Sequence, residues 1–320
     1  MKRRRGWLVG GVLLAAAMAL AVVARSRASA PTEPPPGDEP AASDPTPHPS
    51  IGASSIDGRD FPDGVLALTW DDGPDERTLA LAKFLNQRKV SATFFVVAEW
   101  FAGVSSDPGF GRATFETGYD RIPILPDLLR LGHRLGNHTL HHVLLTEVPP
   151  DDAEAEVREN QRRIDPLLTN ELRLIRAPGG AWDDTVARAL AADPYLDGVV
   201  GPLRWDVDRK DWEGATGCAS SQPAAECEPA SVPGHAQVRP AVVAARYLAS
   251  IEAARHGIVL FHDRVGHVGS DYALDVARAL LPALEARGYV FAAPVLRFSV
   301  PALRTPPDES PLHAVGLADV

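Results

Sequence analysis

Short apolar runs alternate with amphipathic stretches along the chain from about residue 57 to residue 298. The runs that have the length and composition of strands are 64–70, 91–97, 133–137, 172–176, 198–205, 257–262 and 288–293. The stretches that have helical spacing are 78–85, 152–168, 185–192, 240–254 and 272–287. Strands that alternate with helices predict an α/β fold with a largely parallel sheet of about seven strands, open or closed into a barrel.

Polar and titratable residues come directly after five of these apolar runs. They are Asp71 and Asp72, His138, Arg176 and Pro178, Asp208 and Asp211, and His262 and Asp263. Any one of them alone would pass for a turn or surface residue. In parallel α/β folds the reactive groups collect at the carboxyl ends of the strands. The repeated position therefore predicts a single site at that end of the sheet.

The first 30 residues have the pattern of a targeting segment. Met1 is followed by four basic residues, Lys2 to Arg5, and then by an uninterrupted apolar run over 6–24. Ala28-Ser29-Ala30 resembles a signal cleavage site. The apolar run is also close to membrane-spanning length, so an uncleaved signal-anchor that tethers the protein to a membrane is the alternative. Either form predicts an exported protein that is secreted, periplasmic or anchored in the cell envelope.

Composition divides the rest of the chain. Eight prolines among small polar residues in 31–50 predict an extended, disordered linker, which we place at 31–56. The folded domain would follow at 57–298, with a C-terminal tail at 299–320. In an exported protein the two cysteines, Cys218 and Cys227, predict one local disulfide.

The balance of charge limits the partners. The chain has a net charge of -10, and its first 30 residues contain six basic and no acidic residues, so the rest of the chain has 26 basic against 42 acidic residues. A protein that binds nucleic acid needs a basic face, so nucleic acid is not expected as a partner. A neutral glycan is compatible with this charge.

A cluster of histidines suggests a metal site. His138 and His142 are four residues apart, a spacing that would place both on one face of a helical turn and that is common among zinc ligands. His141 could replace one of them. His133 lies inside the preceding apolar run and is expected to be structural.

The paired aspartates could complete this site. A pair of histidines needs a third ligand and an open position to support hydrolysis, and Asp71 or Asp72 can supply the ligand. The other carboxylate, next to a divalent cation, would remain ionised and could act as a base.

Three later segments add groups that hydrolysis needs. Arg176 can orient a carboxylate through a paired contact, and the glycine-rich turn after it lets a main-chain N–H approach an oxyanion. His262, near a carboxylate, is a candidate general acid because an anionic neighbour raises the pKa of an imidazole. Trp212 and Leu260 could line an apolar pocket for a methyl group.

Together these residues resemble the polysaccharide deacetylase family, carbohydrate esterase family 4, with its NodB homology domain. The resemblance covers about residues 57–298 and rests on five motifs in order: Thr69-Trp70-Asp71-Asp72-Gly73-Pro74, His138-Thr139-Leu140-His141-His142, Arg176-Ala177-Pro178-Gly179-Gly180, Asp208-Arg209-Lys210-Asp211-Trp212 and Leu260-Phe261-His262.

The resemblance implies a distorted (β/α)7 barrel and a divalent metal, most often zinc, that acts on an acetylated glycan. It implies these roles: Asp72, His138 and His142 as metal ligands, Asp71 as general base oriented by Arg176, His262 as general acid tuned by Asp211, and the N–H of Gly179 as oxyanion donor. Gly179 stands where the family usually has an aromatic residue, so the resemblance leaves the fine substrate preference open. The alternatives are a metal-dependent amidase that acts on a small non-glycan substrate, and a glycan-binding module without catalysis.

Overall fold

The structure is a computed structural model that describes residues 51–101, 124–168, 172–230, 234–266, 269–292, 295–297 and 316–319. The expected targeting segment, residues 31–50 of the expected linker and most of the expected tail lie outside these residues. Among the described helices, none has the length and apolar character needed to cross a membrane.

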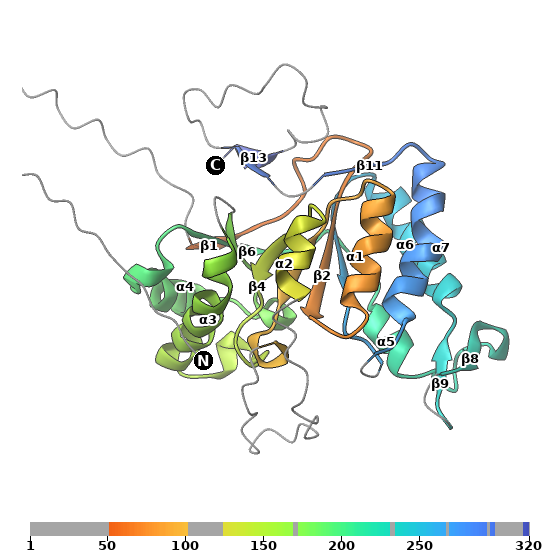
Figure 1. Cartoon of the computed structure of the whole chain (residues 1–320), viewed down its shortest axis with the longest axis horizontal. Helices are drawn as coiled ribbons and strands as arrows, with labels where there is room; N and C mark the ends of the chain where they lie inside the picture. The colour runs from red at the N-terminus through yellow and green to blue at the C-terminus, as the bar shows by residue number, and fades with distance from the viewer. Residues whose placement is uncertain are drawn as a thin grey trace, which may run out of the picture. The chain divides into compact units, whose positions relative to one another are not determined.

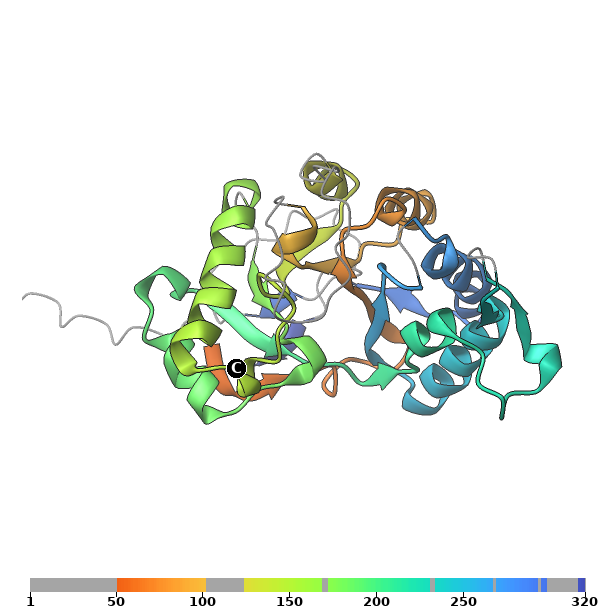
Figure 2. The ribbon, with the colours of Figure 1, turned by 90° about the horizontal axis from the view of Figure 1, so that it is seen from below.

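A single large sheet forms the framework of the described chain. Its nine strands are β1 (Ile51–Ile56), β2 (Val65–Gly73), β3 (Thr93–Val96), β4 (Arg134–Asn137), β5 (Arg173–Ile175), β6 (Val199–Leu203), β7 (Val207–Asp208), β10 (Gly257–His262) and β11 (Val290–Phe291). The order is β1-β6-β5-β4-β3-β2-β10-β7, with β11 beside β2, and neighbouring strands are parallel. The sheet curls into a half-barrel (Figure 2). It stays open, because β1 and β7, at the two ends of the order, do not pair with each other.

Helices connect and cover the strands (Figure 1). They are α1 (Thr78–Gln87), α2 (Ile124–Arg130), α3 (Pro150–Ile164), α4 (Asp184–Ala191), α5 (Asp211–Thr216), α6 (Pro240–Ala254) and α7 (Tyr272–Glu285). All five helical stretches expected from the sequence are present. The predicted α/β fold of the distorted-barrel type is therefore confirmed. The short helices α2 and α5 were not predicted from the sequence.

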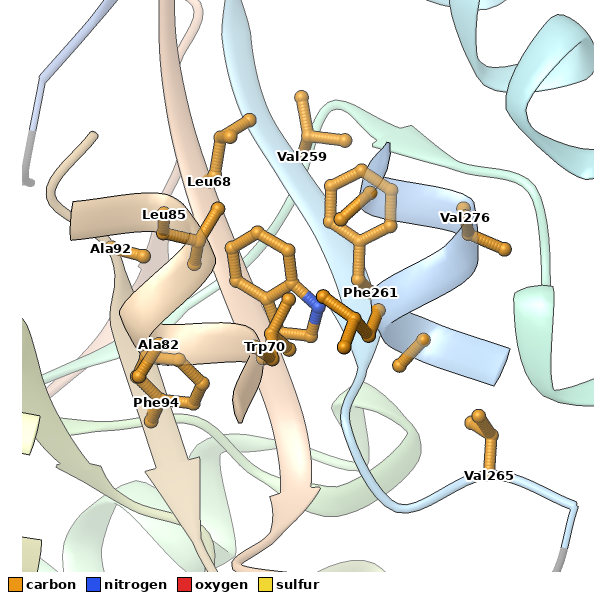
Figure 3. Close-up of a cluster of buried hydrophobic side chains, with 14 of the residues drawn as sticks. Leu68, Trp70, Ala82, Leu85, Ala92, Phe94, Val259, Phe261, Val265 and Val276 are labelled. Atoms are coloured by element: carbon orange, nitrogen blue, oxygen red, sulfur yellow. The ribbon is translucent and has the colours of Figure 1, made fainter. Parts of the chain in front are cut away.

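The side chains of β2 show why the sheet forms. Leu66, Leu68 and Trp70 belong to the large core beneath the helices, whereas Val65 and Ala67 belong to a second cluster on the opposite face. Trp70 is the centre of the larger core: its ring lies 5.8 Å from that of Phe94 and 5.0 Å from that of Phe261 (Figure 3). This alternation, with period two, also assigns Thr69 and Asp71 to the face opposite the helices.

The start of the domain differs from the expected boundary. Residues 51–56, which composition placed in the linker, form β1 and pair with β6. The prolines end at Pro49, and Ile51 is buried in a core cluster with α4 and its neighbours, which offsets the cost of ordering this segment. At the other end, β12 (Val295–Arg297) pairs in parallel with β13 (Gly316–Asp319), which lies within the expected tail.

A small hairpin carries the disulfide. β8 (Cys227–Pro229) and β9 (Ala236–Val238) pair antiparallel between α5 and α6. Cys218 and Cys227 are bonded, with their Cα atoms 6.0 Å apart, so the predicted disulfide is confirmed.

Candidate active site

A break in strand register brings two adjacent carboxylates to one end of the sheet. β2 and β3 are in register at Trp70, and the register shifts before Gly73. Asp72 has φ 73°, in the left-handed region that aspartate tolerates better than most residues. In a regular strand Asp71 and Asp72 would point to opposite faces. Here a carboxylate oxygen of each lies within 4 Å of the same nitrogen, Nε2 of His138, at 3.7 Å and 3.3 Å.

The two histidines converge through a turn and not through a helix, so the expectation of a helical turn was wrong. Thr139 and His142 have φ values of 70° and 57°, which interrupt any helix. The Asn137 side chain accepts the N–H of Thr139 at 2.9 Å, and the Thr139 hydroxyl accepts the N–H of His142 at 3.0 Å. These side-chain bonds take the place of helical hydrogen bonds. The imidazole rings nevertheless lie 5.1 Å apart.

Asp72, His138 and His142 form a compact set of donors whose ligand atoms all lie within 4.8 Å of one another. Oδ1 of Asp72 is 3.0 Å from Nε2 of His142 and 3.3 Å from Nε2 of His138. Nδ1 of His138 lies 2.8 Å from the carbonyl oxygen of Arg176 and donates its proton there. In the neutral imidazole, the Nε2 lone pair then faces a carboxylate oxygen, an arrangement that a metal cation between the two would make favourable.

The donor set fits a divalent metal. Two imidazoles and one carboxylate are a ligand combination that zinc uses when one position stays open. Oδ1 of Asp72 is buried and accepts no aligned hydrogen bond from the described residues. Burial alone would raise the pKa of Asp72, but the charge of His142 and the contact with His138 hold it well below its usual range. The carboxylate is therefore ionised, as a ligand must be.

Arg176 fixes Asp71 beside this donor set. The guanidinium is fully buried, and its Nη1 donates to Oδ1 of Asp71 at 2.8 Å and to the hydroxyl of Thr69 at 2.8 Å. Its other nitrogens reach two main-chain carbonyls at 3.3 Å, and its face lies 4.3 Å from the ring of Phe95. These contacts hold Oδ1 of Asp71 and leave Oδ2 on the side of His138.

A second polar pair faces Asp71 from the neighbouring strand. His262 of β10 is the register partner of Asp71. Its Nδ1 lies 2.7 Å from Oδ1 of Asp211, and its main-chain N–H donates to Oδ2 of Asp211 at 2.9 Å. Burial would lower the pKa of His262, but the charge and hydrogen bond of Asp211, with smaller contributions from Asp72 and Asp71, raise it to about 10. His262 is therefore an imidazolium at neutral pH.

The remaining predicted site residues are Gly179, Leu260 and Trp212. Gly179 lies in the turn Pro178–Gly180 with φ 59°. Leu260 is 3% exposed and precedes His262 by two residues, so it shares its face of β10. Trp212 is 42% exposed beside Asp211, so it is a surface residue and not part of the core.

Two other histidines considered from the sequence, His141 beside the site and His133 at the opposite end of β4, have structural partners. Nδ1 of His141 contacts Glu156 at 2.7 Å, and its main-chain N–H donates to the same carboxylate at 2.8 Å. This anchors the turn to α3, and His141 is not one of the three grouped donors. His133 is buried and bonded to main-chain groups, as its predicted structural role requires.

Two residues that position the site groups were not predicted from the sequence. Thr69 accepts a hydrogen bond from Arg176 and donates to the carbonyl of Val259 at 2.8 Å, which positions the guanidinium. Its place on the same strand face as Asp71 was the available signal. Tyr247 of α6 lies 3.3 Å from Asp211 and donates to the carbonyl of Leu260 at 2.8 Å. Nothing in the sequence near Tyr247 indicated this contact.

With this geometry in place, the chain can be compared with known proteins. Residues 58–196 match the family model described as polysaccharide deacetylase. The resemblance to the polysaccharide deacetylase family is confirmed. The matched region contains the first three motifs, and the fourth and fifth lie beyond it.

Relatives of the family cover different shares of the chain. A chitooligosaccharide deacetylase of Sinorhizobium fredii is 30% identical over 45% of this chain and 58% of its own length. A peptidoglycan-N-acetylglucosamine deacetylase of Bacillus cereus is 27% identical over 71% of this chain and 84% of its own length. In two further curated relatives, the match spans only 36% and 27% of the relative.

Solved structures show the same fold. The catalytic domain of a peptidoglycan N-acetylglucosamine deacetylase from Eubacterium rectale has a TM-score of 0.51 at 19% identity, covering 75% of this chain and 91% of its own. The chitin deacetylase of Colletotrichum lindemuthianum has a TM-score of 0.50 at 23% identity, covering 72% and 85%.

Proposed function

We propose that this protein is an exported, metal-dependent deacetylase that removes acetyl groups from N-acetylated polysaccharide. One observation carries the proposal: an oriented carboxylate, Asp71, and an imidazolium, His262, are register partners on neighbouring strands beside the Asp72, His138 and His142 donor set. Amide hydrolysis is accelerated by a base for the water, an acid for the departing amine and a cation or hydrogen-bond donors for the carbonyl oxygen. The family resemblance and the activities of the relatives point to glycan substrates.

The chain's own residues divide the work as follows. Asp71, held by Arg176, accepts a proton from the water that adds to the acetyl carbonyl carbon. The N–H of Gly179 stabilises the negative charge that develops on the carbonyl oxygen. His262 donates its proton to the nitrogen as the carbon–nitrogen bond breaks, which leaves acetate and a free amine. A divalent metal at Asp72, His138 and His142, most often zinc in this family, would supply a cation that activates the water and polarises the carbonyl.

The binding surface and the location extend this proposal. Leu260 and the exposed Trp212 would contact the acetyl methyl group and the sugar. The pattern of residues 1–30 supports export, with cleavage or membrane tethering as the two forms. Mass spectrometry of the mature N-terminus would distinguish them, and a cytosolic protein that retains its first residues would contradict export.

Acetate release tests the reaction. The zinc-loaded protein is incubated with chitin oligomers, with N-acetylated peptidoglycan and with a panel of small amides, and free acetate is measured. We expect release from the glycans only. Asp71→Asn should retain metal but lower turnover by about 10²–10⁴-fold, because it removes the base and leaves the ligands. Asp72→Ala should lose the metal.

His141→Gln is the matched control, because His141 belongs to the same turn but contacts Glu156 and is not one of the three grouped donors. It should retain metal and turnover. Full turnover in Asp71→Asn would overturn the mechanism. Acetate release from small amides alone would favour the amidase, and glycan binding without any release would favour the binding module.

A further inference from the structure

A second arginine lies beside Arg176 at the carboxyl end of the sheet. Arg204 directly follows β6, and its carbonyl oxygen accepts a hydrogen bond from Nη2 of Arg176 at 3.3 Å. Its own guanidinium stacks over the ring of Trp205 at 5.1 Å, and its Nη1 donates to the carbonyl of Gly180 at 2.6 Å. Gly180 is adjacent to Gly179, the proposed oxyanion donor. Arg204 is thus a half-buried cation at the edge of the reaction centre.

The two arginines differ in their partners. Arg176 is paired with Asp71 and uses its nitrogens on four oxygens. Within the described ranges, Arg204 has a hydrogen bond from Nη1 only and no carboxylate within 4.0 Å. A guanidinium carries five donors, so most of its capacity remains for another acceptor. Half-buried cations without a counterion are uncommon because desolvation is costly.

The chain makes room for this guanidinium. A Cβ atom on Gly180 would lie 2.3 Å from Nη1 of Arg204 and would displace the guanidinium, and the φ of Gly180, 65°, favours glycine. Gly179 stands where the family usually has an aromatic side chain, and among the described residues a Cβ there would meet Leu144 alone, at 3.0 Å. The absence of a side chain at Gly180 therefore allows the guanidinium of Arg204 to lie against the turn.

We propose that Arg204 is a specificity residue that binds a carboxylate carried by the glycan, on the sugar that is deacetylated or on the next one. This inference rests on the proposed function, since it places the carboxylate beside the acetyl group at Gly179. Guanidinium binds carboxylate through two parallel hydrogen bonds, and stacking on Trp205 holds its plane. A muramic acid residue, whose lactyl group lies next to its acetamido group, has the required chemistry.

The overall charge does not oppose this contact. The net charge of -10 would repel an anionic polymer at long range. At physiological ionic strength that repulsion is screened beyond about 8 Å, whereas a direct contact with a half-buried guanidinium is screened much less. The local cation therefore decides the binding of a single carboxylate.

Three substrates test the inference with the zinc-loaded full chain. One is an oligosaccharide of alternating N-acetylglucosamine and N-acetylmuramic acid, the second is the same chain with its lactyl carboxylates converted into carboxamides, and the third is a neutral chitin oligomer. We expect KM to be about 10–100-fold lower for the free carboxylate than for the carboxamide, the range given by a hydrogen-bonded charge. Arg204→Gln should abolish this difference and leave kcat and KM for the chitin oligomer within about twofold.

The controls separate the outcomes. Arg188→Gln on α4 removes the same charge at a position away from the site. It should not change the preference for the carboxylate over the carboxamide. An equal loss on all three substrates in Arg204→Gln would show that Arg204 only supports the Gly180 turn, and would overturn the inference. Equal KM values for carboxylate and carboxamide with the unmodified protein would also overturn it, even if Arg204→Gln does not fold.

The chitin oligomer reports on the proposed function independently, because it has no carboxylate. If no substrate is turned over, calorimetric binding of the carboxylate and carboxamide oligosaccharides still decides the role of Arg204. Tighter binding of the carboxylate that Arg204→Gln removes would support it, and equal binding would contradict it.

Discussion

Two histidines flank the same strand, β4, and differ in their hydrogen-bond partners. His133 precedes β4 and His138 follows it, and both are nearly inaccessible, at 3% and 2% exposure. At the amino end, Nδ1 of His133 accepts the N–H of Ala92 at 3.2 Å and Nε2 donates to the carbonyl of Ala82 at 2.9 Å. At the carboxyl end, only Nδ1 of His138 contacts the main chain, and Nε2 faces Asp71 and Asp72.

Burial therefore does not separate the structural histidine from the functional one. The partners do. Main-chain groups cannot change charge, so they fix a single neutral state of His133, whose pKa burial lowers. The carboxylates beside His138 attract a cation, and a metal or a proton can supply it. The difference predicts that variants at the carboxyl end change chemistry, and that variants at the amino end change stability.

The largest effect is expected from His138→Gln. This variant removes one of three ligands, so the protein should lose its metal and release no measurable acetate. Atomic absorption on the purified protein measures the metal. Because a ligand that binds only the folded state stabilises it, added zinc should also stop raising the melting temperature.

His133→Gln is the matched comparison on the same strand, and it should retain a full complement of metal. If His138→Gln retained its metal and His133→Gln lost it, the distinction between the two ends of β4 would be reversed.

An intermediate effect is expected from Asp211→Asn. The pKa of His262 is raised to about 10 chiefly because Asp211 outweighs burial. The acid form of His262 is the active one, so activity is lost as pH rises through its pKa. Without the charge of Asp211 the pKa falls and the basic limb of the kcat profile should move to lower pH. At pH 8 we expect a loss on the order of 10²-fold that shrinks as the pH is lowered.

A metal at Asp72 would neutralise part of the negative charge near His262, but the contribution of Asp211 would remain. The profile of kcat against pH for both proteins checks this. A basic limb at the same pH in Asp211→Asn would contradict the role of Asp211, whatever the size of the loss.

Much of the fold and the site could be predicted from the sequence because period-two and period-3.6 patterns are local. The apolar runs located the strands, and their carboxyl ends located Asp71, Asp72, Arg176 and His262. Local pattern did not find β1, since its six residues become ordered only by pairing with β6, more than a hundred residues later in the chain.

Several features of the site depend on tertiary contacts that local sequence patterns do not indicate. The spacing of His138 and His142 suggested a helix, but the side chains of Asn137 and Thr139 form a turn with the same convergence. Tyr247 contacts Asp211 from a helix 36 residues away, and Arg204 reaches Gly180 from the next strand. Such contacts are determined by tertiary packing. Sequence motifs therefore identify the reacting groups but not the residues that position them.

The smallest effect on chemistry is expected from His133→Leu, which tests the amino end directly. Leucine leaves the N–H of Ala92 without its side-chain acceptor and removes the contact of Nε2 with the carbonyl of Ala82, so the free energy of unfolding should fall by about 1–3 kcal/mol. Because burial lowers the pKa of His133 below its ordinary value of 6.5, the unfolded chain binds the proton more tightly. The contribution of His133 is therefore present above about pH 6.5 and lost as the pH falls. Urea unfolding at several pH values should show a flatter acid slope in the variant, with unchanged turnover per folded molecule; loss of metal or turnover would show that both ends of β4 serve the site.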